Sequence, residues 1–296
     1  MHISYSLTAA LSASLFAVST PVQAELPLNI EEIITDKGKI KLELSMSYAN
    51  LESSGLSIGE PFVIQTGPTS FMALPASIGE RTTNSDSLIG TTGLRYGLTG
   101  NAEIYTRANY LHYRYRSIEA DGTKNNSNDT RWVDAWGGIN YRLKKDDDTP
   151  AIMGFAEIAL YEKYNESQSS FKSAMMGFTT YRAIDPVVVS LTASYQFNKE
   201  RKDGDIDYKP GNLVLLNPSV AFAANDRITL ITGMQWINRA ADRLNGQDQG
   251  MRRTSSDLIL GVGYGVAKGN TLNFTFKSNT SGRGGADLRF SWLYTL

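Results

Sequence analysis

The sequence predicts an all-β protein: a single closed antiparallel transmembrane β-barrel of about twelve strands, with short periplasmic turns, long extracellular loops and a short N-terminal helical segment. Three observations support this fold class. Residues 288–296 alternate between an apolar face and a mostly polar face, similar segments recur along the chain, and the connections alternate between tight turns and long polar loops. A soluble β-sandwich also contains alternating strands, but it has no reason for every second loop to be long.

The N-terminal residues are typical of a secretory signal peptide. Residues 7–22 are apolar or small, and Val22-Gln23-Ala24 provides a small-x-small cleavage site. The alternative, a buried N-terminal helix, is disfavoured by the many Ser and Thr residues and by Pro21. We therefore expect three segments: a signal peptide at 1–24, a short periplasmic or plug helix at 25–38, and the transmembrane β-barrel at 39–296.

Composition limits the other classes of protein. The chain has 296 residues, no cysteine, a net charge of -1 and a mean hydropathy of -0.27. An exported chain without cysteine has no disulfides, so closure and packing must stabilise it. No apolar run after residue 24 is long enough for a transmembrane helix. The interspersed charges do not indicate nucleic-acid binding.

Residues 26–38 have a different pattern from the predicted strands. Asn29 is placed to cap a short helix, with Glu32 three residues later, and Gly38 is placed to end it. On such a helix Ile30, Ile33 and Ile34 share one face, and we name them as candidates for a plug or latch.

Strict alternation begins directly after this segment. Residues 39–51 form the first predicted strand, and lipid cannot satisfy an open sheet edge, so this strand should pair with the last one. In the predicted strands the apolar residues, for example Val133, Ile139, Tyr141 and Leu143, face outward. The other predicted strands lie at 88–98, 104–115, 133–143, 152–160, 171–183, 187–197, 213–222, 228–236, 258–266, 272–276 and 288–296.

Tight connections are predicted at Thr99-Gly100, Asp185-Pro186, Asn225-Asp226 and Gly269-Asn270. Aromatic residues occur toward strand ends or on outward faces, where the girdles of membrane barrels lie. The alternative interpretation is that these aromatic side chains only pack against their neighbours in the sheet. The aromatic set is Tyr48, Trp132, Trp236, Tyr264, Trp292 and Tyr294, and the predicted assembly signal is Leu288, Phe290, Trp292, Tyr294 and Leu296.

The connection at 52–84 is unusual for a solvated loop. It contains the apolar patches 61–64 and 71–75. Loops of this length are usually functional or folded onto another part of the protein. Two alternatives remain open: the connection folds into or over the barrel mouth, or it forms an extracellular hairpin.

Catalytic and metal-binding motifs are not found. His112 is the histidine outside the signal segment, and no serine precedes it in the arrangement that outer-membrane phospholipase A requires. The run Asp146-Asp147-Asp148 lacks metal-ligand spacing and is typical of a solvated turn. The glycines at 261, 263 and 265 lie in a strand pattern, not in a nucleotide-binding loop. We expect no enzyme activity, no cofactor and no metal.

Charged and polar residues should face the barrel interior if the apolar faces meet lipid. They indicate either a hydrophilic path for a solute or a narrow barrel filled by ion pairs, and strand number alone does not decide. The predicted lumen-lining residues are Lys41, Glu43, Arg95, Arg107, Asp134, Glu157, Gln196, Asp257, Lys277 and Arg289.

Residues 28–38, running directly into the alternating segment 39–43, resemble the start of barrels in the meta-pathway phenol-degradation outer-membrane family. The barrel is also similar to Fap-type secretion channels for functional amyloid. The first resemblance implies passage of small, often aromatic or hydrophobic compounds, and the second implies export of unfolded subunits. Fap-type channels carry a longer segment before the barrel than the roughly dozen residues present here.

Three functions are therefore compatible with the sequence. The first is an outer-membrane channel for small solutes, with residues 26–38 as a plug or latch. The second is a secretion or anchoring barrel for an exported polypeptide, and the third is a structural barrel with a filled lumen. The expected partners are outer-membrane lipid, the barrel-assembly machinery, and a small solute or an exported polypeptide; a homo-oligomer is left open and no nucleic acid is expected.

Overall fold

The computed structural model describes residues 34–53, 56–58, 62–67, 70–74, 78–119, 122–164, 167–281 and 284–296. The predicted signal peptide at 1–24, the plug candidates Ile30 and Ile33, and most of the predicted helix lie outside these residues and stay predictions.

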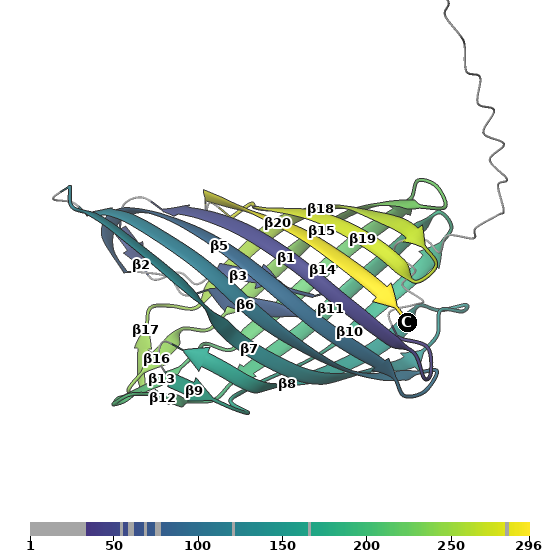
Figure 1. The fold of residues 1–296 in the computed structure, drawn as a ribbon, viewed down its shortest axis with the longest axis horizontal. Coiled ribbons are helices and arrows are strands. Elements are labelled where there is room, and N and C mark those ends of the chain that lie inside the picture. The colour runs from purple at the N-terminus through teal and green to yellow at the C-terminus, as the bar shows by residue number, and fades with distance from the viewer. Residues whose placement is uncertain are drawn as a thin grey trace, which may run out of the picture.

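Twelve long strands form one closed antiparallel barrel (Figure 1). The first strand, β1, pairs with the last, β20, from Lys41 opposite Thr295 to Glu52 opposite Gly284, and its other edge pairs with β5. The predicted closure is therefore confirmed. The barrel strands are β1 (Ile40–Ser53), β5 (Ile78–Gly97), β6 (Ala102–Glu119), β7 (Lys124–Lys144), β8 (Ala151–Tyr164), β10 (Ser173–Ile184), β11 (Val187–Asn198), β14 (Leu213–Ala223), β15 (Ile228–Arg239), β18 (Arg253–Ala267), β19 (Asn270–Asn279) and β20 (Gly284–Thr295).

The two ends of the barrel differ. One end carries the tight turns and the start of β1, and β20 also finishes there (Figure 1). The other end carries short extra strands, and by the loop asymmetry of outer-membrane barrels it is the extracellular end. Among the described residues, no helix is long and apolar enough to cross a membrane. The short strands are β2 (Leu56–Ile58), β3 (Phe62–Gln65), β4 (Phe71–Leu74), β9 (Ser167–Ser169), β12 (Arg201–Asp203), β13 (Ile206–Lys209), β16 (Asp242–Leu244) and β17 (Gln247–Gln249).

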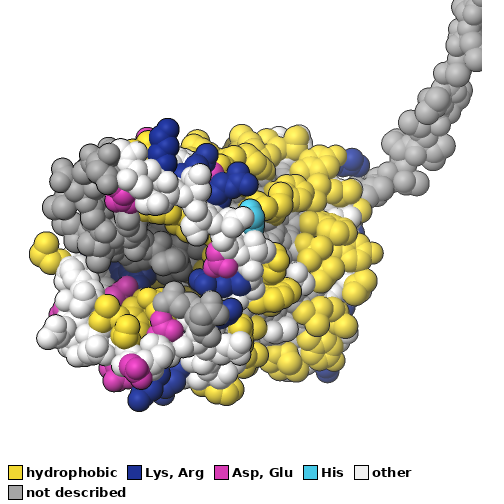
Figure 2. Space-filling view, turned by 60° about the vertical axis from the view of Figure 1, so that its left-hand side comes forward, with side chains coloured by type: hydrophobic (Ala, Val, Ile, Leu, Met, Phe, Trp, Pro, Cys, Tyr) yellow, Lys and Arg dark blue, Asp and Glu magenta, His cyan; other side chains and the backbone are white. Residues whose placement is uncertain are grey.

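Side chains alternate between the two faces of the wall as the sequence predicts. On β1, Met46 and Tyr48 are 53% and 41% exposed, whereas Ser45, Ser47 and Ala49 are buried. Figure 2 shows hydrophobic side chains gathered over the barrel wall and charged side chains gathered at the extracellular end. Four of the five predicted assembly residues are exposed apolar side chains, and Trp292 is half-buried; their role in assembly stays a prediction.

One strand departs from the predicted alternation. Val133 packs against the buried interior residues Ile89 and Leu111, although we predicted that it faces outward. The pairing of β6 with β7 shifts register at Asn109, which lies opposite Asp134, so that Tyr110 lies opposite Trp132. A β-bulge inserts one residue and turns its side chain away from the regular pattern. The outward position is taken by Trp132, which is 56% exposed.

The described end of the predicted N-terminal helix is not helical. Lys37 forms a parallel β-bridge with Gly97, and the Gly38 amide donates a hydrogen bond to the Gly97 carbonyl oxygen. A side chain at Gly97 would overlap the backbone of Asp36 and Thr35, so this close approach requires glycine. Tertiary contact with the end of β5 therefore overrides the helical spacing in this part of the segment.

Candidate functional site

The interior face of the barrel divides into two arcs. The arc from β18 through β19, β20, β1, β5, β6 and β7 to β8 carries buried side chains of both charges, and we call it the charged arc. The remaining strands, β10, β11, β14 and β15, form the neutral arc. Strands β11 and β14 contain no charged residue; on β10 the one charged residue, Arg182, lies next to the buried Tyr181 and so on the opposite face, and Arg239 is the last residue of β15.

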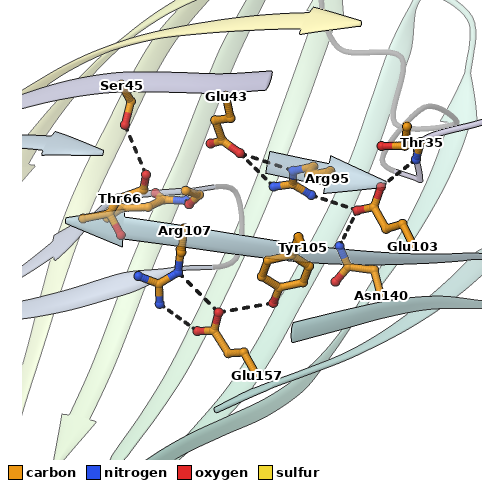
Figure 3. A network of polar contacts seen from close by, with 12 residues as sticks. Thr35, Glu43, Ser45, Thr66, Arg95, Glu103, Tyr105, Arg107, Asn140 and Glu157 are labelled. Atoms are coloured by element: carbon orange, nitrogen blue, oxygen red, sulfur yellow. Dashed lines mark hydrogen bonds and ion pairs between the residues drawn. The ribbon is translucent and has the colours of Figure 1, made fainter. Parts of the chain in front are cut away.

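Arg95 is the centre of the first ion-pair cluster in the charged arc (Figure 3). Its Nη2 lies 2.9 Å from Glu43 Oε2, and its Nη1 lies 2.9 Å from Glu103 Oε1. Asn140 donates a second hydrogen bond to Glu103, at 2.6 Å. All four side chains are buried, so removing one partner would leave an unpaired charge away from water.

A second cluster lies beside the first, around Arg107. Its Nη2 lies 2.9 Å from Glu157 Oε1, and the Tyr105 hydroxyl donates to Glu157 Oε2 at 3.2 Å (Figure 3). Asp134 accepts a 2.6 Å hydrogen bond from Asn109 and lies 3.9 Å from Arg107 Nη1. Arg107 of β6 is thus paired with carboxylates from the neighbouring strands β7 and β8, two carboxylates to one cation.

The third cluster centres on Lys277 of β19. Its ammonium lies 3.3 Å from Asp287 and 4.0 Å from Asp257, and it donates to the backbone oxygen of Val63 at 2.9 Å. Val63 belongs to the 52–84 connection. One wall cation therefore joins two wall carboxylates to a segment inside the barrel.

Strands β3 and β4 form a hairpin that folds into the barrel, which decides between the two alternatives for the 52–84 connection. We call its described residues, 62–67 and 70–74, the plug hairpin. Four of its apolar side chains pack on two different parts of the wall. Ile64 and Met72 pack against Ala49, Ile89 and Leu111, whereas Val63 and Phe71 pack against Phe155, Met175, Leu213, Leu215 and Ile237.

The turn of the plug hairpin reaches the Arg95 cluster. The Thr66 carbonyl oxygen accepts hydrogen bonds from Ser45 Oγ at 3.2 Å and from Arg289 Nη2 at 3.0 Å. The same Arg289 nitrogen lies 3.4 Å from Glu43. Between this turn and the charged arc remains a cavity of about 10 Å³, which is room for about one water molecule.

The N-terminal segment reaches the same cluster from the periplasmic side. The Thr35 amide donates a 2.6 Å hydrogen bond to Glu103 Oε2, and Ile34 is buried. The latch position that we predicted for Ile34 is therefore close to the charged arc. Thr35, Glu103, Arg95, Glu43, Arg289 and Thr66 form a continuous series of polar contacts from one inserted segment to the other.

The structure places the predicted lumen residues on the interior face, where most of them are paired. Lys41 and Gln196 are half-buried, and Gln196 donates to Asn198 at 3.1 Å. The sequence-based prediction missed Glu103 and Asp287, because the predicted strands began one residue after each of them. Extending the alternation by one residue would have placed both carboxylates inward. Whether these residues line a path for solute stays a prediction.

The candidates for catalysis and metal binding have ordinary partners. His112 Nδ1 lies 2.7 Å from the Thr130 hydroxyl, on the outward face of β6. Asp146 pairs with Arg182 at 3.0 Å. Hydrogen bonds from the Lys144 ammonium and the Thr149 amide lower the pKa of Asp147 to about 2. In the described part of the chain, no group of three or more His, Cys, Asp or Glu side chains is arranged to hold a metal.

A closed antiparallel barrel with an apolar outer wall, a charged interior and long extracellular loops is a transmembrane β-barrel of the bacterial outer membrane. No protein-family model and no curated protein matches the sequence. The resemblance to the phenol-degradation family and to the Fap-type channels therefore stays a prediction.

Solved structures agree with this class of protein. The COG4313 outer membrane channel from Pseudomonas putida F1 superposes with a TM-score of 0.65 and 9% identity over 88% of this chain and 96% of the other. The translocator domain of the autotransporter NalP from Neisseria meningitidis gives 0.51 and 9% over 90% and 91%. Identities this low establish the fold alone.

Proposed function

We propose that the protein is an outer-membrane channel for small solutes, and that the described arrangement is its closed state. The observation that carries the proposal is the plug hairpin. It forms its own two-stranded sheet, separate from the barrel sheet. Displacing it would break side-chain contacts but none of the strand pairing that closes the wall.

Hydrogen bonds join backbone oxygens of the described hairpin residues to side chains of the wall. Ser45, Lys277 and Arg289 bind the backbone oxygens of Val63 and Thr66, and Ser47 Oγ lies 3.5 Å from the Gln65 oxygen. Each bond of this kind stabilises by about 0.5–3 kcal/mol, with the charged donors at the upper end. Such contacts hold the hairpin in place while leaving it separable from the wall.

The apolar attachment opposes spontaneous opening. Val63, Ile64, Phe71 and Met72 are all buried. Exposing them to water would cost up to about 6–12 kcal/mol in total, from about 1.5–3 kcal/mol for each side chain. A solute that opens the channel must therefore replace part of this packing, since a ligand shifts an equilibrium only through its different affinity for the two states.

This requirement indicates the class of solute. The neutral arc binds Val63 and Phe71 through apolar side chains, whereas the facing charged arc presents paired Arg and Glu side chains. A small solute with an apolar body and a polar or ionised end fits both arcs. An aromatic compound of this kind agrees with the phenol-degradation resemblance, and a solved barrel of similar fold is named an outer membrane channel.

Single-channel recording in planar bilayers tests the proposal. We expect the full chain to be closed most of the time, and replacement of residues 59–77 by a short Gly-Ser linker to produce a steady conductance. The matched control removes residues 242–249, which belong to the small extracellular sheet. These residues contribute no side chain to the two groups of apolar residues that pack on the plug hairpin. No conductance from the linker variant, when it is folded, would favour the structural barrel with a filled lumen instead.

A further inference from the structure

A cleft of about 460 Å³ opens at the extracellular end, between the loop after β13 and the loop that contains β16 and β17. It belongs neither to the plug hairpin nor to the ion-pair clusters of the interior. Its lining combines backbone, small side chains and three cations: Lys209, Pro210, Gly211, Asn212, Ala240, Ala241, Arg243, Asp248, Gly250, Met251 and Arg252.

Two lining residues of the cleft contact aromatic rings on the outward face of the wall. The Lys209 ammonium is 6.0 Å from the centre of the Phe197 ring, and Asn212 Nδ2 donates to the Tyr195 hydroxyl at 2.8 Å. Phe197 and Tyr195 are 40% and 42% exposed on the outward face of β11, near its extracellular end. Aromatic side chains at this height mark the boundary between the hydrocarbon and the headgroups.

The charge of the cleft is positive. Lys209, Arg243 and Arg252 line it together with one carboxylate, Asp248. The Asp248 carboxylate is paired with Arg243, because its Oδ1 lies 2.6 Å from Arg243 Nε. The cations of the cleft therefore exceed its carboxylates by two, at the level where the headgroups of the outer leaflet begin.

We propose that this cleft binds the phosphate of a phosphorylated lipid headgroup in the outer leaflet, while the acyl chains of that lipid lie along the apolar outer wall. Guanidinium and ammonium groups form strong charge-assisted hydrogen bonds with phosphate oxygens. Basic pockets next to a membrane bind lipid headgroups in the same way. A lipid satisfies both parts of the site, whereas a free phosphate satisfies only the cations. The inference does not depend on whether the lumen opens.

Native mass spectrometry of the full chain in detergent tests the proposal, with titration by diphosphorylated lipid A and by its dephosphorylated form. The variant is Lys209→Ala/Arg252→Ala. We expect it to bind the phosphorylated lipid about 10- to 30-fold more weakly, since each cation near an anionic surface contributes about 1 kcal/mol. The control is Lys199→Ala/Lys202→Ala, which removes the same charge from exposed positions that lie outside the cleft, on the loop that also carries Lys209.

The control should change binding less than about threefold, because screening weakens exposed charges beyond about 10 Å at ordinary salt. Binding of the dephosphorylated lipid should be weak for all chains. Equal losses of affinity for the phosphorylated lipid in the variant and in the control would overturn the proposal. Competition by millimolar inorganic phosphate as strong as that by the lipid would also overturn it, because the cleft would then be a site for soluble anions. Unchanged heat-modifiable mobility on gels verifies that both variants fold.

Discussion

The charged arc and the neutral arc are built from the same strand geometry but hold the interior together by different forces. In the charged arc, Arg95, Arg107 and Lys277 each contact two or more buried carboxylates. In the neutral arc, Met175, Leu215 and neighbouring side chains pack on the plug hairpin. The neutral arc also contains uncharged polar pairs, such as the Thr179 and Thr192 hydroxyls, 2.9 Å apart, and its Gln235 accepts a hydrogen bond from Lys277.

Together the two arcs hold one hairpin in a barrel that also has a polar interior. Side chains of the charged arc donate hydrogen bonds to the hairpin's backbone oxygens. These bonds fix the orientation of the hairpin relative to the wall. The neutral arc packs on Val63 and Phe71, whereas Ile64 and Met72 pack on apolar residues of β1, β5 and β6, so both arcs contribute to the burial free energy. Neither arc pairs with the hairpin as a strand, so the hairpin can be attached firmly without becoming part of the wall.

The largest expected effect comes from breaking the charged arc at Arg95. Arg95→Met should lower the free energy of unfolding by about 3–5 kcal/mol, because it leaves two buried carboxylates without their shared cation. It should also loosen the contact of Glu103 with Thr35 and of Glu43 with Arg289. Urea unfolding in detergent, followed by tryptophan fluorescence, measures the change.

A matched change in the neutral arc sharpens this comparison. Thr192→Val removes one neutral hydrogen bond, that to Thr179, and should cost about 1 kcal/mol. If Arg95→Met costs no more than Thr192→Val, the ion pairs of the charged arc do not stabilise the barrel more than neutral hydrogen bonds do.

An effect between those of Arg95→Met and Thr192→Val is expected from the packing of the neutral arc. Leu215 is fully buried against the plug hairpin, whereas its neighbour Leu216 is 37% exposed on the outer wall. Leu215→Ala should cost about 2–4 kcal/mol by leaving a cavity. Leu216→Ala should cost less, because lipid can fill the space. Limited proteolysis of the 52–84 connection should accelerate for Leu215→Ala only, and equal rates would contradict the packing of the hairpin on this arc.

Most of the barrel could be predicted because strand alternation is a local property. In each predicted strand, the residues between the outward apolar residues face the interior. Sequence spacing alone therefore predicts that residues such as Glu43 and Arg289 lie on the interior face. Closure followed from the cost of an unpaired edge in lipid. Where the local rule is interrupted, as at the bulge next to Val133, the same reasoning placed the side chain on the wrong face.

The plug hairpin and its partners could not be predicted in detail because they depend on contacts between distant parts of the chain. The apolar patches at 61–64 and 71–75 indicated burial but not where. Lys277 binds Val63 across 214 residues of sequence, and Arg289 binds Thr66 across 223. No local pattern encodes which wall residue meets a loop. The loss of helix at 34–38 has the same origin, since Gly97 provides the competing contact.

The smallest expected effect lies outside both arcs, in the periplasmic turn after β7, and it sets a baseline for exposed charges. The Lys144 ammonium and the Thr149 amide donate to Asp147, whose pKa is lowered from 3.8 to about 2. A carboxyl group with a lowered folded-state pKa stabilises above its unfolded pKa, and this stabilisation is lost as the pH falls from about 4 to about 2. Asp147 is fully exposed, so we expect no measurable change in unfolding free energy for Asp147→Asn. The shift itself is measurable by carboxyl-carbon NMR titration, and Lys144→Met should move the midpoint back toward 3.8. A midpoint that does not move would show that the Thr149 amide, and not the ion pair, holds the Asp147 carboxylate.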